Sequence, residues 1–120
     1  MTHRAALTVV LLTLLGLAAC AHTEEIQVSD VKMFTGNWEG RAVIRATSLP
    51  AALSVKEDGS YTGHVGGRPV QGVIRAVSGQ GTFGSGELKG TLGLFESSSG
   101  KRLLRAWADT GEVFDYEERK

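Results

Sequence analysis

Residues 36–46 read GNWEGRAVIRA, a stretch in which apolar or small residues alternate with polar ones along most of its length. Trp38 and Ala42 fall on one face of such a segment, and Glu39 and Arg41 fall on the other. This alternation is typical of a β-strand with one buried and one solvated face, because successive side chains of a strand point to opposite sides. The stretch therefore predicts a half-buried strand that begins at Gly36 and runs to Ala46.

The rest of the chain repeats this pattern between turns. Ser48-Leu49-Pro50 is expected to end the first strand, and Asp58-Gly59 predicts a hairpin because both residues tolerate a positive φ. The chain holds 16 glycines and only 2 prolines, which indicates many tight turns and strands with small faces. Seven further strands are expected over residues 51–56, 61–65, 69–78, 82–85, 87–96, 102–108 and 112–119.

Short strands at roughly ten-residue spacing, with no helix between them, predict antiparallel neighbours. A sheet of this kind leaves exposed edges unless it closes on itself. We therefore expect an all-β fold, a small antiparallel up-and-down β-barrel of about eight short strands. A two-sheet β-sandwich is the alternative.

The first twenty residues carry a different signal. Met1–Arg4 is short and basic, Ala5–Ala19 is largely apolar, and Cys20 is the only cysteine of the chain. As a helix, Ala5–Ala19 would reach about 22 Å, short of the roughly 30 Å hydrocarbon core of a bilayer. The segment predicts a signal peptide over residues 1–19 rather than a transmembrane helix, and an ordinary cleaved secretion signal is the other alternative.

Leu17-Ala18-Ala19-Cys20 resembles the lipobox of bacterial lipoproteins. The resemblance implies cleavage before Cys20, acylation of Cys20, and a membrane as the partner of the acylated residue. Ala21 resembles the residue that directs such proteins to the outer membrane. The implied location is therefore the bacterial cell envelope, on the outer membrane and facing the periplasm.

The remaining chain divides into two parts. We expect a lipid-anchored tether over residues 20–34, with a short helix from Ser29 to Phe34 capped by Ser29 or Asp30, and a barrel domain over residues 35–120. The whole chain has 13 basic and 13 acidic residues, a balance that provides no basic surface for nucleic acid. With Cys20 consumed by lipid, no cysteine remains for a disulfide.

The Gly36-Asn37-Trp38 sequence resembles the first signature of the calycin and lipocalin families. The resemblance implies a short helix before Trp38, a closed barrel end that Trp38 plugs, and an arginine packed on the indole, for which Arg105 is the matching position. This chain departs from the family pattern in having Glu39 directly after Trp38. The Thr-Asp-Tyr motif of the family is also missing, and the chain is shorter than a full lipocalin.

Inward-facing apolar residues are the candidate ligand-binding residues. They are Trp38, Ile44, Leu53, Tyr61, Leu92 and Leu94. The wider aromatic set could line the same cavity or simply fill the barrel interior, which small eight-stranded barrels allow. That set is Trp38, Tyr61, Phe83, Phe95, Trp107, Phe114 and Tyr116. Inward glycines would either leave volume for a ligand or let the sheet bend sharply.

The sequence provides no catalytic or metal-binding pattern. Asp58, Ser60 and His64 crowd one hairpin and are expected to form a solvated turn, and no histidine or cysteine pairing indicates zinc. No catalytic residue, metal or cofactor is predicted. We expect a non-enzymatic, lipid-anchored binding module for a small apolar ligand or an envelope protein, and the alternative is a structural or assembly accessory with a filled barrel.

Overall fold

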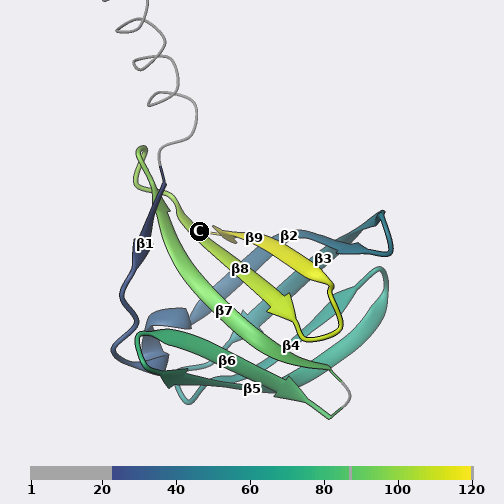
Figure 1. The fold of residues 1–120 in the computed structure, drawn as a ribbon, viewed down its shortest axis with the longest axis horizontal. Helices are drawn as coiled ribbons and strands as arrows, with labels where there is room; N and C mark the ends of the chain where they lie inside the picture. Colours follow the sequence, from purple (N-terminus) through teal and green to yellow (C-terminus); the bar gives the residue numbers. More distant parts are fainter. Residues whose placement is uncertain (1–22, 87, 120) are drawn as a thin grey trace, which may run out of the picture.

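The computed structural model describes residues 23–86 and 88–119, so the expected signal peptide and Cys20 lie outside the described residues. The described chain forms nine strands and one 3₁₀ helix, η1 (Figure 1). Their bounds are β1 Thr23–Ile26, η1 Val31–Phe34, β2 Gly36–Ile44, β3 Thr47–Val55, β4 Ser60–Val65, β5 Arg68–Val77, β6 Gln80–Ser85, β7 Leu88–Ser97, β8 Arg102–Ala108 and β9 Val113–Arg119.

Strands β2 to β9 form a closed antiparallel barrel. Each of them pairs with its neighbour in sequence, and β2 also pairs with β9, so that no strand of the barrel is left with a wholly unpaired edge. Closure satisfies the backbone groups that an open sheet would expose. The predicted up-and-down β-barrel of eight strands is confirmed, and the β-sandwich alternative is wrong.

Strand β1 is an additional strand that the sequence pattern did not predict. It pairs with the second half of β7, where Thr23 lies opposite Ser97 and Ile26 opposite Leu94, while β6 pairs with the first half. Val28 follows β1, is buried, and donates its N–H to the carbonyl of Gly79. The later part of the segment expected as a tether is therefore packed on the barrel from Thr23 onward.

The turn between β2 and β3 also differs from the prediction. Arg45 and Ala46 form a two-residue turn in which both residues have a positive φ, so β3 begins at Thr47 and includes Pro50. The Pro50 carbonyl accepts a hydrogen bond from the Gly66 N–H, so the backbone of Pro50 lies beside the turn that follows β4. Its missing N–H faces that turn instead of a paired strand, so the strand tolerates proline there.

Helix η1 covers one end of the barrel. Asp30 caps it by accepting a hydrogen bond from the Lys32 N–H at 2.9 Å, and Phe34 at its C-terminus is fully buried. This confirms the predicted short helix and, of its two candidate caps, identifies Asp30. We refer to the end that η1 covers as the closed end.

Trp38 lies at the closed end and is 1% exposed. Its indole N–H donates to the Phe34 carbonyl at 2.9 Å, which holds η1 against β2. The guanidinium of Arg102 lies over the indole ring, with its central carbon 5.4 Å from the ring centroid, a distance at which cation–π attraction operates. Arg102 also donates to the Glu118 carboxylate at 2.9 Å and to the Met33 carbonyl.

The arginine expected over Trp38 was Arg105, and that expectation is wrong. Arg105 pairs with Asp115 on the outer surface of β8 and β9. Leu104 and Ala106 are buried, so the even-numbered residues of β8 face the interior and Arg105 faces solvent. Arg102 shares the inward face and lies at the end of β8 nearest η1.

The inward glycines let neighbouring strands approach closely. A Cβ added to Gly40 would lie 1.7 Å from the carbonyl oxygen of Asp115, and one added to Gly90 would lie 1.9 Å from that of Trp107. Real side-chain atoms cannot occupy such positions. Of the two expected roles for inward glycines, the structure favours sharp bending of the sheet at these positions.

Replacing Trp38 with alanine should lower the free energy of unfolding by about 3–5 kcal/mol, because it removes a fully buried side chain and leaves a cavity. Trp107→Ala is the matched control, since Trp107 is 39% exposed on the outer surface and its loss should cost about 1 kcal/mol or less. Urea unfolding followed by circular dichroism measures both values. Equal losses for the two variants would contradict the role given to Trp38.

Candidate functional site

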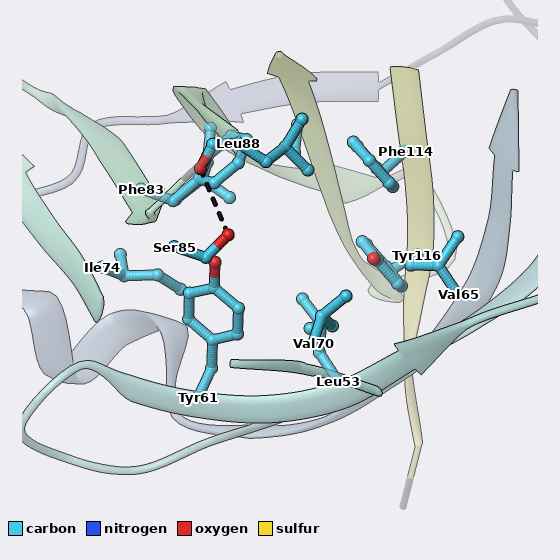
Figure 2. Close-up of a pocket in the computed structure, with 12 residues that line it drawn as sticks. Leu53, Tyr61, Val65, Val70, Ile74, Phe83, Ser85, Leu88, Phe114 and Tyr116 are labelled. Atoms are coloured by element: carbon cyan, nitrogen blue, oxygen red, sulfur yellow. Dashed lines mark hydrogen bonds between the residues drawn. The ribbon is translucent and has the colours of Figure 1, made fainter. Parts of the chain in front are cut away.

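An apolar pocket lies inside the barrel and reaches toward the end opposite η1. Twelve side chains from seven of the eight barrel strands line it, and nearly all are apolar (Figure 2). They are Leu53, Tyr61, Val65, Val70, Ile74, Phe83, Ser85, Leu88, Leu92, Ala106, Phe114 and Tyr116.

The mouth of the pocket is formed by half-buried residues next to two turns. Val65 and Val70 flank the β4–β5 turn, and Ser85 and Leu88 flank the β6–β7 turn. Both turns lie at the end of the barrel away from η1, since β2 starts at the closed end and each following strand reverses direction. We refer to this end as the open end.

Three of the six predicted ligand-binding residues line this pocket: Leu53, Tyr61 and Leu92. Trp38 and Leu94 are fully buried in the core and are not part of the lining. Ile44, at the end of β2, is half-buried against the core and is also absent from the lining.

The aromatic residues fall into two groups, those on the inward face of a strand and those on its outward face. Tyr61, Phe83, Phe114 and Tyr116 line the pocket, and the rings of Phe114 and Tyr116 are stacked with centroids 6.4 Å apart. Phe95 on β7 and Trp107 on β8 alternate with inward residues and lie on the outer face, so neither contributes to the cavity. The expectation that these two could line it is wrong.

The prediction missed several lining residues that alternation would have placed on the inward face. Val65 follows Tyr61 and Gly63 along β4, and Val70 and Ile74 share one face of β5. Ser85 is the least expected, because a polar residue on the inward face interrupts the apolar pattern of β6. Alternation identified the face of each residue but gave no reason to choose these positions over others.

The pocket is small, with a cavity volume of about 40 Å³. One water molecule needs roughly 10–15 Å³ measured in this way, so the space could hold about three waters. Pockets for drug-sized ligands are roughly 300–1,000 Å³. The cavity as it stands suits a few non-hydrogen atoms.

Three hydroxyl groups interrupt the apolar wall: those of Tyr61, Ser85 and Tyr116. The Ser85 hydroxyl donates to the Leu88 carbonyl at 3.3 Å (Figure 2). Burial raises the pKa of the Tyr61 phenol, and hydrogen bonding by Ser85 partly offsets the rise. Burial also raises the pKa of Tyr116, and the nearby Tyr61 adds to that rise. Both phenols are therefore protonated at neutral pH.

The hairpin that holds Asp58, Ser60 and His64 forms a turn, as expected. The Asp58 carboxylate accepts hydrogen bonds from the Ser60 N–H at 2.9 Å and from its hydroxyl at 2.6 Å, and these bonds lower the pKa of Asp58. His64 is exposed on the outward face of β4. Within residues 23–86 and 88–119, no group of three or more histidine, cysteine, aspartate or glutamate side chains is placed to hold a metal ion.

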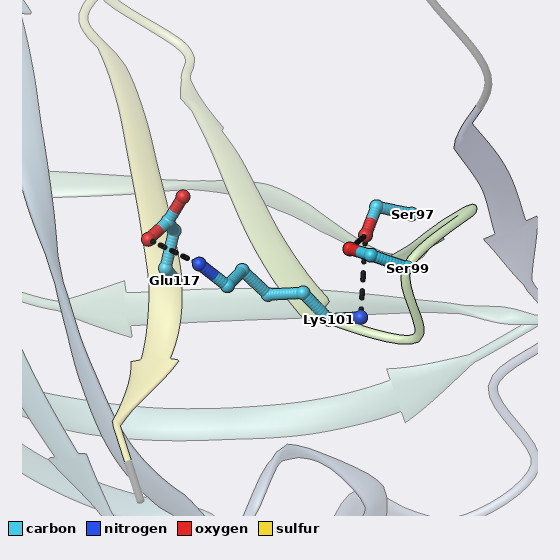
Figure 3. A network of polar contacts seen from close by, with 4 residues as sticks. All are labelled: Ser97, Ser99, Lys101 and Glu117. Atoms are coloured by element: carbon cyan, nitrogen blue, oxygen red, sulfur yellow. Dashed lines mark hydrogen bonds and ion pairs between the residues drawn. The ribbon is translucent and has the colours of Figure 1, made fainter. Parts of the chain in front are cut away.

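Polar contacts hold the β7–β8 turn at the closed end (Figure 3). The hydroxyls of Ser97 and Ser99 lie 2.9 Å apart, and the Lys101 N–H donates to the Ser97 hydroxyl at 3.2 Å. The Lys101 ammonium lies 3.4 Å from the Glu117 carboxylate, an exposed pair of the kind that contributes little stability. This turn is next to Thr23, where the described chain begins.

Across the part of the chain that the structure describes, no helix is long and apolar enough to cross a membrane. Comparison of the chain with models of protein families, with curated proteins and with solved structures finds no match.

The chain has only two tyrosines, so a spectroscopic titration reports on this pocket alone. In the folded protein, phenolate absorbance at 295 nm should be below half of its final value at pH 10, the ordinary pKa of a tyrosine, and should develop fully only at higher pH. In urea, both tyrosines should titrate near pH 10. Half-ionisation at pH 10 in the folded protein would show that the phenols are not buried.

The same shifts predict how stability depends on pH. Below pH 10 the phenols are protonated in both the folded and the unfolded state, so the tyrosines do not change the free energy of unfolding with pH. Above pH 10 the unfolded chain loses them first, so the free energy of unfolding should fall by up to about 1.4 kcal/mol per pH unit for each tyrosine.

Proposed function

We propose that this protein is a lipid-anchored, non-enzymatic protein of the bacterial cell envelope that binds a small apolar ligand in the open end of its barrel. The anchor is Cys20, acylated after removal of residues 1–19. The ligand site is the pocket lined by Leu53, Tyr61, Leu92 and their neighbours. The partners are the membrane, through Cys20, and the ligand.

The observation that carries this proposal is the apolar lining of a pocket that approaches the barrel surface at one end. Nine of the twelve lining residues have wholly apolar side chains, and the other three are Tyr61, Tyr116 and Ser85, a composition typical of small-molecule sites. The half-buried valines at the mouth, Val65 and Val70, leave apolar surface at the open end. A ligand with an apolar part would gain free energy by covering that surface.

The position of β1 orients the pocket relative to the proposed anchor. Thr23 pairs with Ser97 at the closed end, next to the β7–β8 turn, whereas the pocket approaches the open end. Two residues lie between Cys20 and Thr23, so the two Cα atoms are at most about 11 Å apart. An acylated Cys20 would thus hold the closed end near the bilayer and leave the mouth facing the aqueous compartment.

The resemblance to calycins is part of the proposal. Helix η1, the buried Trp38 and the guanidinium of Arg102 over its ring support it, because the resemblance implies each of these features. Eight-stranded barrels of the lipocalin type can hold one small ligand, which agrees with the proposed function. The small cavity implies a ligand smaller than those of full-length lipocalins.

A binding site for an envelope protein is the second candidate, and a specific observation favours it. Val43, Val113 and Trp107 are adjacent across β2, β9 and β8 on the outer surface, and Val43 and Trp107 are exposed. Exposed apolar side chains that form a continuous row are more typical of contact surfaces than of ordinary solvated strands. A structural accessory that uses this row would need no open pocket.

Replacing Cys20 with alanine should release the protein from the membrane without unfolding it, because the variant loses the acylated residue and no part of the barrel. Fractionation of cells followed by immunoblotting measures the location, and circular dichroism of the released protein checks the fold. A variant that stays with the membrane fraction after high-salt and carbonate washes would rule out Cys20 as the anchor.

Replacing Val70 with phenylalanine should fill the mouth of the pocket and prevent a small molecule from copurifying with the protein. Val73→Phe is the matched control, because Val73 is on the same strand but is exposed on the outer face. Native mass spectrometry should detect bound mass in the wild-type protein and in V73F but not in V70F. Bound mass that is equal in all three would place the ligand outside the barrel.

A further inference from the structure

The hydroxyl of Tyr116 is a polar group with no partner in a pocket that is otherwise apolar. The residue is only 4% exposed, and no described residue forms a hydrogen bond with its hydroxyl. The oxygen is nevertheless not sealed off, since Thr35 Oγ1 is the one buried side-chain oxygen among the described residues that lacks both a partner and solvent contact. The Tyr116 hydroxyl therefore faces space that another molecule can enter.

The neighbouring hydroxyls leave Tyr116 as the available donor. Ser85 donates its hydroxyl proton to the Leu88 carbonyl (Figure 2). The Tyr61 hydroxyl points toward the Ser85 oxygen and interacts with it. A Cβ at position 72 would lie 2.5 Å from the Tyr61 hydroxyl oxygen, so Gly72 makes the room that this phenol occupies. Because both phenols keep their protons at neutral pH, Tyr116 donates to any acceptor placed beside it.

The lining carries no charge. All twelve lining residues are neutral at pH 7, and the basic residues at the open end, Arg45, Arg68 and Lys89, are exposed and absent from the lining. An anion moved into such a pocket would lose its hydration without gaining a cationic partner, which is strongly unfavourable. A neutral acceptor such as a carbonyl or hydroxyl oxygen avoids that cost and still satisfies Tyr116.

We propose that the ligand is a short, neutral amphiphile whose carbonyl or hydroxyl oxygen accepts a hydrogen bond from Tyr116, while its apolar chain lies against the mouth residues Val65, Val70 and Leu88. This inference rests on the proposed function and assigns the chemical class of its ligand. The cavity volume of about 40 Å³ limits the ligand to a short chain. Long acyl chains do not fit this volume.

The test compares three probes of similar size. Hexan-2-one carries a neutral acceptor, 2-methylhex-1-ene replaces that oxygen with a methylene group, and hexanoate carries an anion. Each is titrated into the anchored protein held in lipid nanodiscs with labelled leucine and valine methyl groups, and shifts of the Leu53, Val65 and Val70 methyls report binding in the pocket. Empty nanodiscs correct for partition of the probes into lipid.

Hexan-2-one should bind more tightly than hexanoate, whose charge would lose its hydration without gaining a cationic partner. Tyr116→Phe should weaken hexan-2-one binding about fivefold, the usual effect of one lost hydrogen bond, and should leave 2-methylhex-1-ene binding unchanged. Thr91→Val, on the outer face of β7, is the control and should alter neither affinity. Urea unfolding of Y116F checks that the barrel remains folded, because the ring is retained.

The outcomes distinguish a failure of the proposed ligand class from a failure of the proposed ligand-binding function. If Y116F binds hexan-2-one as tightly as the wild-type protein does, or if hexanoate binds more tightly than the ketone, the ligand class is wrong while the pocket remains a binding site. If none of the three probes shifts the pocket methyls, the proposed ligand-binding function fails and this inference fails with it.

Discussion

The contact between Trp38 and Arg102 is the constraint on which the rest of the structure depends. The indole holds η1 through the Phe34 carbonyl, and the guanidinium above it joins β8 to β9 through Glu118 and to η1 through Met33. Two parts of the chain that are distant in sequence, η1 with β2 and β8 with β9, therefore meet at one buried ring. Because this cluster fills the closed end, space for a ligand can exist only toward the open end.

The close approach of neighbouring strands determines how much space remains inside the barrel. At Gly40 and Gly90 the neighbouring strand occupies the volume that a side chain would need, so the sheet coils tightly around a narrow interior. Gly72 also lies against the backbone of the neighbouring strand, with the Gly84 carbonyl oxygen 2.3 Å from an added Cβ, and in addition it makes room for the Tyr61 phenol. The small cavity follows from both effects, and its size argues for a short ligand as strongly as its apolar lining argues for an apolar one.

The pocket combines an apolar wall with hydroxyls that cannot all be satisfied by the protein. Ser85 has a backbone acceptor, but Tyr116 has none among the described residues. A hydroxyl that lies among apolar side chains without a protein partner obtains its hydrogen bonds from solvent or from a ligand. Such a group is consistent with a binding site whose partner is supplied from outside, and its neutrality selects against charged ligands.

The sequence by itself determined the fold class, the strand positions and the face of nearly every residue, because alternation with a period of two records which side chains are buried. It also predicted η1 and its Asp30 cap, since capping is a local interaction. It did not predict β1, whose polar residues carry no alternation, or the Arg45-Ala46 turn, where neither residue favours a positive φ.

Only the tertiary structure decided the height of each residue, by which we mean its position along the barrel axis between the closed and the open end. Trp38 and Leu53 share the inward face, yet one plugs the closed end and the other lines the pocket. The same limit explains why Val70 and Ser85 were missed, whereas Arg105 fails to reach Trp38 because it lies on the outward face of β8. Alternation identifies a face, whereas height depends on the register between strands, and register is set by pairings between residues that are far apart in sequence.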